Sequence, residues 1–114
     1  MSTEEYIRKL ALSLPEVTVE LHFEKIAFKV KKKIFLTLNL AKNRVCVKLS
    51  ESDQDLFSLA DNTIVYAVPN KFGKQGWTLI ELEKVNEALL IDVIKTAYCE
   101  VAPQKLAQLV NFEE

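Results

Sequence analysis

The chain has 114 residues, of which 49% are hydrophobic and 27% are charged, and its formal net charge is −1. This length and composition predict one globular domain over residues 1–114 and exclude a disordered or low-complexity chain. The balanced charge gives no overall attraction to nucleic acid or to acidic membranes. No apolar run approaches the roughly 18 residues that span a bilayer, and the start of the chain lacks the apolar core of a signal peptide. We therefore expect a cytoplasmic protein without membrane contact.

The first half of the chain is expected to contain a helix followed by strands. Ser2 and Glu5 have the spacing of a capping box, so a helix is predicted to begin near Thr3 and to end before Pro15. Residues 17–23 are typical of a short strand or of an extended lead-in. Three further segments alternate apolar and polar residues and predict an antiparallel meander. These segments are residues 26–30, 34–40 and 44–49, and the alternation places Ile34 inside and Phe35 outside.

In the second half, Ser50 can cap a short helix over residues 51–60. Residues 64–68 and 77–82 are predicted strands, joined by a loop. Residues 87–98 predict a strong helix, and Pro103 suits the first turn of a last helix that continues to Val110. The order is helix, four strands, helix, two strands and two helices. It predicts a two-layer α+β domain with an antiparallel sheet and helices packed on one face.

The strongest local signal is a run of positive charge without any acid, between Lys25 and Lys48. Alternation gathers part of it on the outward face of the sheet, and the turns present the rest, so that with an exposed Phe35 this surface could follow a phosphate backbone. The alternative is that these lysines keep the protein soluble and protect sheet edges from aggregation. The eight residues of the run are Lys25, Lys29, Lys31, Lys32, Lys33, Lys42, Arg44 and Lys48.

The loop before the last strand contains both glycines, Gly73 and Gly76, and leads to the only tryptophan, Trp77. The glycines permit a positive φ or a close approach of another chain segment. The Walker pattern is absent, so this is no phosphate loop of that kind. Two interpretations of Trp77 remain open: an indole that stacks on a base, or one that anchors its own loop in the core.

Four segments give the chain a resemblance to a known family. They are LSLPEVTVELHF, IAFKVKKKIFLTLNL, PNKFGKQGWTLIEL and LLIDVIKTAYCEV. Their order resembles that of MmcQ/YjbR proteins over about residues 3–110. The resemblance implies a two-layer α+β fold, similar in outline to secretion chaperones and to CyaY-like proteins. It also implies DNA binding through two hairpins that form a "double wing". This chain departs from the family pattern because lysine replaces the usual Gly or Asn of the first hairpin, and Glu16 replaces a commoner Gly.

Catalytic and metal sites have little support in the sequence. His22 is the single histidine, and it has no ligand spacing to Cys46 or Cys99. The two cysteines have apolar neighbours, so buried reduced thiols are expected in preference to a disulfide or a reactive pair. We predict no enzyme activity, no metal and no cofactor.

The sequence therefore favours a DNA-binding or other nucleic-acid-binding protein of this family, in which lysines hold phosphates. The alternative is a protein-interaction module or homodimer of chaperone type that does not bind nucleic acid. The predicted nucleic-acid-binding residues are Lys29, Lys31, Lys32, Lys33, Lys42, Arg44 and Lys48, together with Lys71, Lys74 and Trp77 as a second wing.

Overall fold

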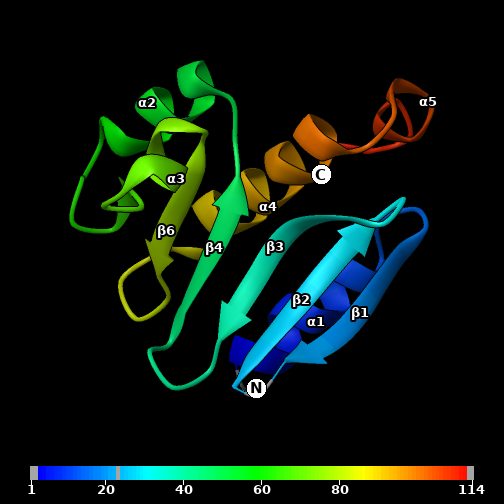
Figure 1. Cartoon of the computed structure of the whole chain (residues 1–114), viewed down its shortest axis with the longest axis horizontal. Helices are drawn as coiled ribbons and strands as arrows, with labels where there is room; N and C mark the ends of the chain where they lie inside the picture. Colours follow the sequence, from blue (N-terminus) through cyan, green and yellow to red (C-terminus); the bar gives the residue numbers. More distant parts are fainter. Residues whose placement is uncertain (1–2, 23, 113–114) are drawn as a thin grey trace.

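Six strands form one antiparallel sheet, and helices complete the core on one of its faces (Figure 1). The computed structural model describes residues 3–22 and 24–112. The helices are α1 (Thr3–Leu12), α2 (Glu51–Ser58), α3 (Lys71–Lys74), α4 (Glu87–Val101) and α5 (Gln104–Ala107). The strands are β1 (Val17–His22), β2 (Lys25–Val30), β3 (Lys33–Asn39), β4 (Arg44–Lys48), β5 (Val65–Ala67) and β6 (Trp77–Glu81). The predicted α+β class is confirmed.

The strands lie in the order β1-β2-β3-β4-β6-β5, and every neighbouring pair is antiparallel. Strands β2, β3 and β4 form the predicted meander, and β1 pairs with β2 at its edge. Because β6 returns beside β4, the β2–β3 turn and the β5–β6 connection lie at the same end of the sheet. The β3–β4 turn lies at the opposite end (Figure 1). The topology therefore divides the lysine-bearing turns between two ends.

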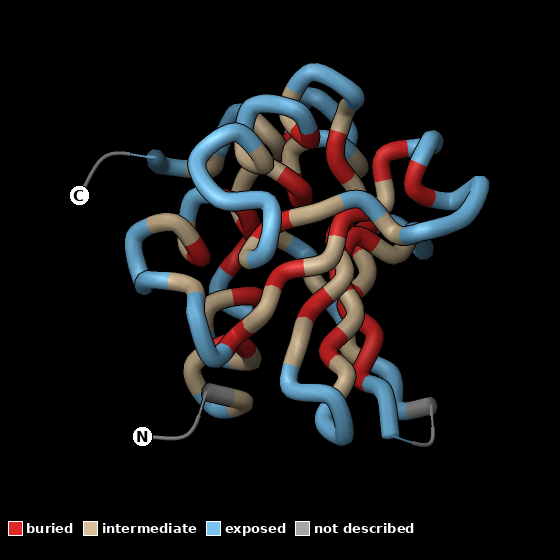
Figure 2. The backbone as a smooth tube through the Cα atoms, turned by 90° about the vertical axis from the view of Figure 1, so that its left-hand side faces the viewer, coloured by how far each residue is buried: buried red, intermediate tan, exposed pale blue. Residues whose placement is uncertain are grey.

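The core lies between the sheet and helices α1 and α4. Buried and more exposed residues alternate along the strands, as Figure 2 shows. Phe28, Leu36 and Val47 are 0% exposed and sit opposite one another in the sheet register. Ile7 of α1 and Ile94 of α4 cover this face and are also fully buried. Each such side chain contributes about 1.5–3 kcal/mol through burial, so the helix-covered face supplies most of the stability.

Tyr98 joins α4 to two other parts of the chain. Its ring packs edge-on against Phe35 with the ring centroids 5.4 Å apart. Its hydroxyl donates a hydrogen bond to the carbonyl oxygen of Pro15 at 2.6 Å, which satisfies the polar end of a buried residue. The link fixes α4 against the connection between α1 and β1.

The outward position predicted for Phe35 is wrong. The pairing of β2 with β3 shifts between Phe28 and Lys29, so that Phe28 opposes Leu36 and Lys29 opposes Ile34. Phe35 is the extra residue of this bulge. It points to the helix side and is 0% exposed, whereas Ile34, predicted inside, is only half-buried.

The loop that opens the last strand contains a short helix, α3, which the sequence did not predict. Asn70 caps it by accepting a hydrogen bond from the Phe72 amide at 2.8 Å. Gly76 has φ +104, and a Cβ at this position would lie 1.8 Å from the Leu49 carbonyl oxygen. A Cβ at Gly73 would lie 2.0 Å from the carbonyl oxygen of Val68. The glycines therefore allow this loop to press against its neighbours.

Gln54 of α2 holds the same loop in place. Its side-chain NH2 lies at 3.0 Å from the carbonyl oxygen of Gly73, at 3.2 Å from that of Trp77 and at 3.0 Å from the Thr78 hydroxyl. Gln54 is only 8% exposed, so these contacts satisfy a buried amide. The loop is consequently part of the folded framework.

The remaining helices lie where the sequence predicts them, but their ends differ: α2 ends at Ser58 and α4 continues to Val101. Ser50 accepts a hydrogen bond from the Asp53 amide at 3.1 Å, which confirms it as the cap of α2. The last helix, α5, ends at Ala107 and so is shorter than predicted, and Pro103 precedes it as the N-cap. The predicted cap at Ser2 lies outside the described residues. Within the part of the chain that is described, no helix has the length and apolar character needed to cross a membrane.

Candidate functional site

The sheet face opposite α1 and α4 carries three rows of side chains that run across the strands. The strand register fixes which residues share a row. The Lys25 row contains Lys25, Asn39, Arg44 and Glu81. The Cys46 row contains Glu20, Ala27, Thr37, Cys46, Leu79 and Tyr66. The Lys48 row contains Lys29, Lys48 and Trp77, and the bulge interrupts it on β3.

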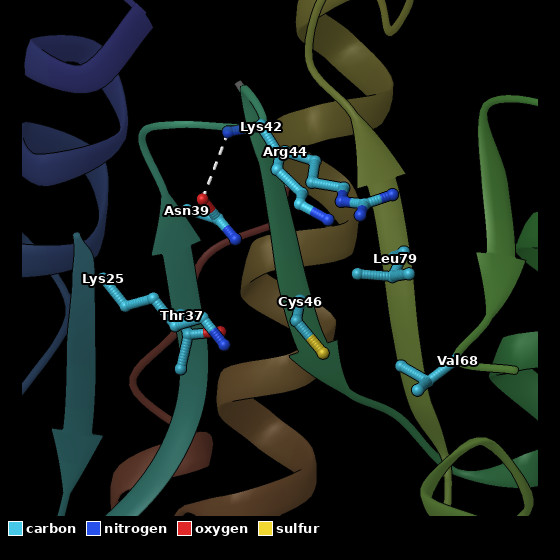
Figure 3. A pocket seen from close by; sticks show the side chains of 8 residues that line it. All are labelled: Lys25, Thr37, Asn39, Lys42, Arg44, Cys46, Val68 and Leu79. Atoms are coloured by element: carbon cyan, nitrogen blue, oxygen red, sulfur yellow. Dashed lines mark hydrogen bonds between the residues drawn. The ribbon is translucent and has the colours of Figure 1, made fainter. Parts of the chain in front are cut away.

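A hollow of about 430 Å3 opens on this face, which we call the outer face. Figure 3 shows Cys46 at its centre, with the Lys25 side chain entering from β2 and the Lys42 side chain from the β3–β4 turn. The residues that line it are Lys25, Thr37, Asn39, Lys42, Arg44, Cys46, Val68 and Leu79. Three of these are cations and none is an acid.

Arg44 is held by two partners at the edge of the hollow. Its Nη1 lies 3.5 Å from Glu81 Oε2 and donates a hydrogen bond to the Tyr66 hydroxyl at 3.0 Å. The Tyr66 hydroxyl donates in turn to Glu81. Burial raises the pKa of Tyr66, and the hydrogen bond to Glu81 raises it further, so Tyr66 remains a donor. The charge of Arg44 is thus largely balanced by Glu81.

The two cysteines are free thiols and partly buried. Burial raises the pKa of Cys46 to about 11 from an ordinary value of 9.0, although the charges of Lys25 and Arg44 act in the opposite direction. Burial also raises the pKa of Cys99. Cys46 is therefore a neutral thiol at physiological pH and forms an uncharged floor for the hollow.

Two more of the predicted phosphate-binding lysines form ion pairs with residues near β1. Lys29 Nζ lies 2.7 Å from Glu20 Oε1, and Lys31 Nζ lies 2.7 Å from Glu16 Oε1. Exposed pairs of this kind contribute at most about 1 kcal/mol, so a phosphate can compete with the carboxylate.

Three lysines of the outer face have no such partner. Lys25, Lys42 and Lys48 form no ion pair with any residue in the described ranges 3–22 and 24–112. Lys48 Nζ donates only to the carbonyl oxygen of Leu49, at 3.3 Å. These ammonium groups are available to an anion without the loss of an internal pair.

The predicted lysines that belong to the turns and to α3 lie at the two ends of the sheet. The group 31–33 in the β2–β3 turn and the pair Lys71 and Lys74 in α3 lie at the same end, while Lys42 lies at the other (Figure 1). Lys71 and Lys74 line a second hollow of about 550 Å3. Val68 borders both this hollow and the first one. The outer face and α3 therefore form adjoining surfaces.

Trp77, which begins β6, is half-buried. It lines a hollow of about 250 Å3 together with Lys33, Lys48 and Glu100. The fold thus brings Trp77 together with Lys33 of the β2–β3 hairpin and Lys48 of the outer face. Glu100 of α4 lies beside them.

The β2–β3 turn has an unusual backbone for its sequence. Its two central residues, Lys31 and Lys32, have φ values of 50 and 69. Positive φ at both positions defines the type I′ hairpin, which Asn-Gly normally occupies. Glu16, the ion-pair partner of Lys31, also has a positive φ of 57. Three residues in the left-handed region without glycine make this corner a strained one.

Among the described residues, no group of three His, Cys, Asp or Glu side chains could hold a metal ion. Sequence reasoning missed the central part of the outer face. Lys25 was counted in the charged run but not as a site residue, and the contribution of Tyr66 was not foreseen. Alternation placed Cys46 on the outward face, but only the strand register brings Leu79 and Tyr66 beside it.

Comparison with known proteins identifies relatives for most of the chain. A family model described as YjbR matches residues 12–100. The crystal structure of Deinococcus radiodurans protein DR2400, with the family-model domain DUF419, is similar with a TM-score of 0.76 and 21% sequence identity. The similarity covers 89% of this chain and 79% of that one, and at this identity it shows the fold alone. No curated protein matches the chain.

Proposed function

This chain belongs to the YjbR family, and we propose that it binds nucleic acid through the outer face of its sheet and the lysines at the sheet's ends. The observation that carries the proposal is the set of lysines around the 430 Å3 hollow and the Lys48 row. Lys25, Lys42 and Lys48 have no ion-pair partner in the described chain. An open face with fixed cations around an uncharged floor is complementary to a phosphate backbone.

Further lysines extend this surface at the end where the β2–β3 turn lies. Lys32 and Lys33 likewise form no ion pair within the described residues, and Lys33 shares a hollow with Lys48 and Trp77. Neighbouring strands lie about 4.8 Å apart, so β3 and β6 at this end are separated by about 10 Å. A bound strand or duplex could contact both groups at once.

The contacts proposed here position a nucleic acid and do not read its sequence. Lysine ammonium groups on phosphates carry no base information. Five contacts, from Lys25, Lys32, Lys33, Lys42 and Lys48, predict that log affinity for a duplex falls with log salt at a slope of about −4.5. Binding at low salt and loss at high salt are therefore expected.

Fluorescence anisotropy of a labelled short duplex, titrated with protein at several salt concentrations, tests the proposal. Changing Lys31, Lys32 and Lys33 together to Gln is expected to weaken binding and to make the slope shallower by about two, since two of these lysines have no ion pair. A matched variant changes Lys9, Lys84 and Lys105 to Gln. These three lysines are exposed and lie outside the outer face. Because each triple variant replaces three lysines, the two variants have the same net charge.

Equal weakening by the two triple variants would mean that binding depends on net charge alone. The absence of binding at low salt would remove the nucleic-acid proposal.

A second candidate function is self-association or peptide binding at the edge of the sheet. β1 is an edge strand with six residues, and Leu21 within it is 69% exposed. Leu40, which is 45% exposed, lies in the neighbouring β3–β4 turn, whose backbone bonds to the β1–β2 connection. A strand added to β1 would satisfy its free backbone groups and cover Leu21. Light scattering after size exclusion over a dilution series tests this, and Leu21→Lys should abolish any dimer without altering DNA binding.

A further inference from the structure

We infer that the outer face binds single-stranded nucleic acid, with the strand lying along the Cys46 row across the sheet. The inference rests on the proposed function and adds the class of ligand and its path. It predicts that an unpaired strand is bound more tightly than a duplex of the same length.

The Cys46 row forms a trough between the two flanking rows, because its own side chains are short on β2, β3 and β4. Ala27, Thr37 and Cys46 occupy β2, β3 and β4 in this row. Lysine or arginine stands two residues away on β2 and on β4, in both directions along each strand. At about 3.3 Å per residue, the two flanking rows are separated by about 13 Å. The trough crosses from β2 to β5, a length of about 19 Å at the usual strand spacing.

Cations flank the trough on both sides. The ammonium groups of Lys25 and Lys42 belong to one side, and that of Lys48 to the other. None of the three is paired with an acid of the described chain. Phosphates of a single strand could alternate between the two sides while its bases face the floor.

The floor suits a base better than it suits a phosphate. Cys46 is a neutral thiol and Leu79 is apolar, so neither repels an uncharged ring. The Asn39 side-chain oxygen accepts a hydrogen bond from the Lys42 amide at 3.1 Å. This leaves the Asn39 NH2 group free to donate, and Figure 3 shows it on the side of the hollow.

An aromatic ring closes the trough at β5. Tyr66 ends the Cys46 row, and its hydroxyl is held by Glu81 and Arg44. A ring fixed by hydrogen bonds at its polar end could stack on a base, which contributes about 1–3 kcal/mol per base in single-strand binding.

A duplex cannot use this floor. Its bases are paired and stacked, so a duplex would contact only the lysines beside the trough and those in the turns. A single strand gains the same phosphate contacts and adds base contacts with Leu79, Asn39 and Tyr66. The preference for single strands is the feature that distinguishes this ligand from other polyanions.

The test compares a labelled oligonucleotide of about ten nucleotides with the duplex that it forms, at one salt concentration, by fluorescence anisotropy. The unmodified protein is expected to bind the single strand at least about tenfold more tightly, the equivalent of one stacked base. Cys46→Leu fills the trough without a change of charge. It should remove this preference by weakening single-strand binding, with circular dichroism as the check of folding.

Alkylation of the two native thiols gives a second readout that needs no variant. The single strand should slow the modification of Cys46 and leave that of Cys99, which belongs to α4, unchanged. The inference is overturned, and the proposed function survives, if duplex and single strand bind equally well and Cys46 is not protected. Equal protection of Cys46 by inorganic phosphate would also overturn the inference. If the protein binds neither the single strand nor the duplex, both the inference and the proposed function are overturned.

Discussion

Replacing Lys31 by Asn and Lys32 by Gly is expected to stabilise the protein. The two lysines occupy the central positions of the β2–β3 turn with φ values of 50 and 69. Asn and Gly are the residues that a type I′ turn favours, because they adopt positive φ at little cost. The change leaves the strand register and the core untouched.

The magnitude follows from three terms. Two residues other than glycine in the left-handed region cost about 2–4 kcal/mol together. Removing this cost stabilises the protein, but the new glycine destabilises it by about 0.5–1 kcal/mol, because it increases the conformational freedom of the unfolded chain. The Lys31–Glu16 ion pair is also lost, but both side chains are 54% exposed, so this removes at most about 1 kcal/mol. The net gain is about 1–2 kcal/mol, or about 4–8 °C in Tm.

Urea unfolding followed by circular dichroism measures this gain as a higher midpoint with an unchanged m value. Changing both lysines to Gln is the matched control, because it removes the same charges but keeps a backbone that disfavours the turn. It should not be stabilised. If the Asn-Gly variant were no more stable than the Gln variant, the reasoning about turn strain would be refuted.

Three further predictions concern the framework and the thiols. Phe35→Ala should destabilise the fold by about 3–5 kcal/mol in urea unfolding, because the ring is buried against Tyr98. A loss of stability below about 1 kcal/mol would show instead that the Phe35 ring is exposed on the outer face. Gly76→Ala should cost more than about 2 kcal/mol in the same assay, since the new Cβ would meet the Leu49 carbonyl, and a neutral result would contradict the geometry of that loop. The alkylation rate of Cys46 should keep rising with pH up to about 11, and levelling near 9 would show an unperturbed thiol. Because its pKa is raised by folding, Cys46 should also make the protein less stable as pH increases above 9.0.

Most strands were predictable because apolar and polar residues alternate along them, and the meander follows from the short turns between them. The cap at Ser50 is read from local chemistry in the same way. Phe35 was misplaced because a bulge adds one residue to β3 and reverses the alternation at that point. No local pattern in residues 33–36 marks the bulge, which depends on the packing of Phe35 against α4.

The site could be predicted only in part, because it depends on which strands become neighbours. The sequence shows a run of lysines without acids, but the acids that pair with them come from elsewhere. Glu20 reaches Lys29 from β1, and Glu81 reaches Arg44 from β6, which is distant in the chain. The same distant strand supplies Leu79 to the floor of the hollow. The sequence therefore shows where the positive charges are, but only the fold shows which of them are paired with acids.

The most direct test of the account is a map of backbone amide shifts in 15N–1H NMR spectra as a short single-stranded oligonucleotide is added. The largest changes in amide shift are expected on the outer face, at Lys25, Thr37, Cys46 and Lys48. These changes should diminish with added salt. Changes confined to α1 and α4, or to the free edge of β1, would contradict it.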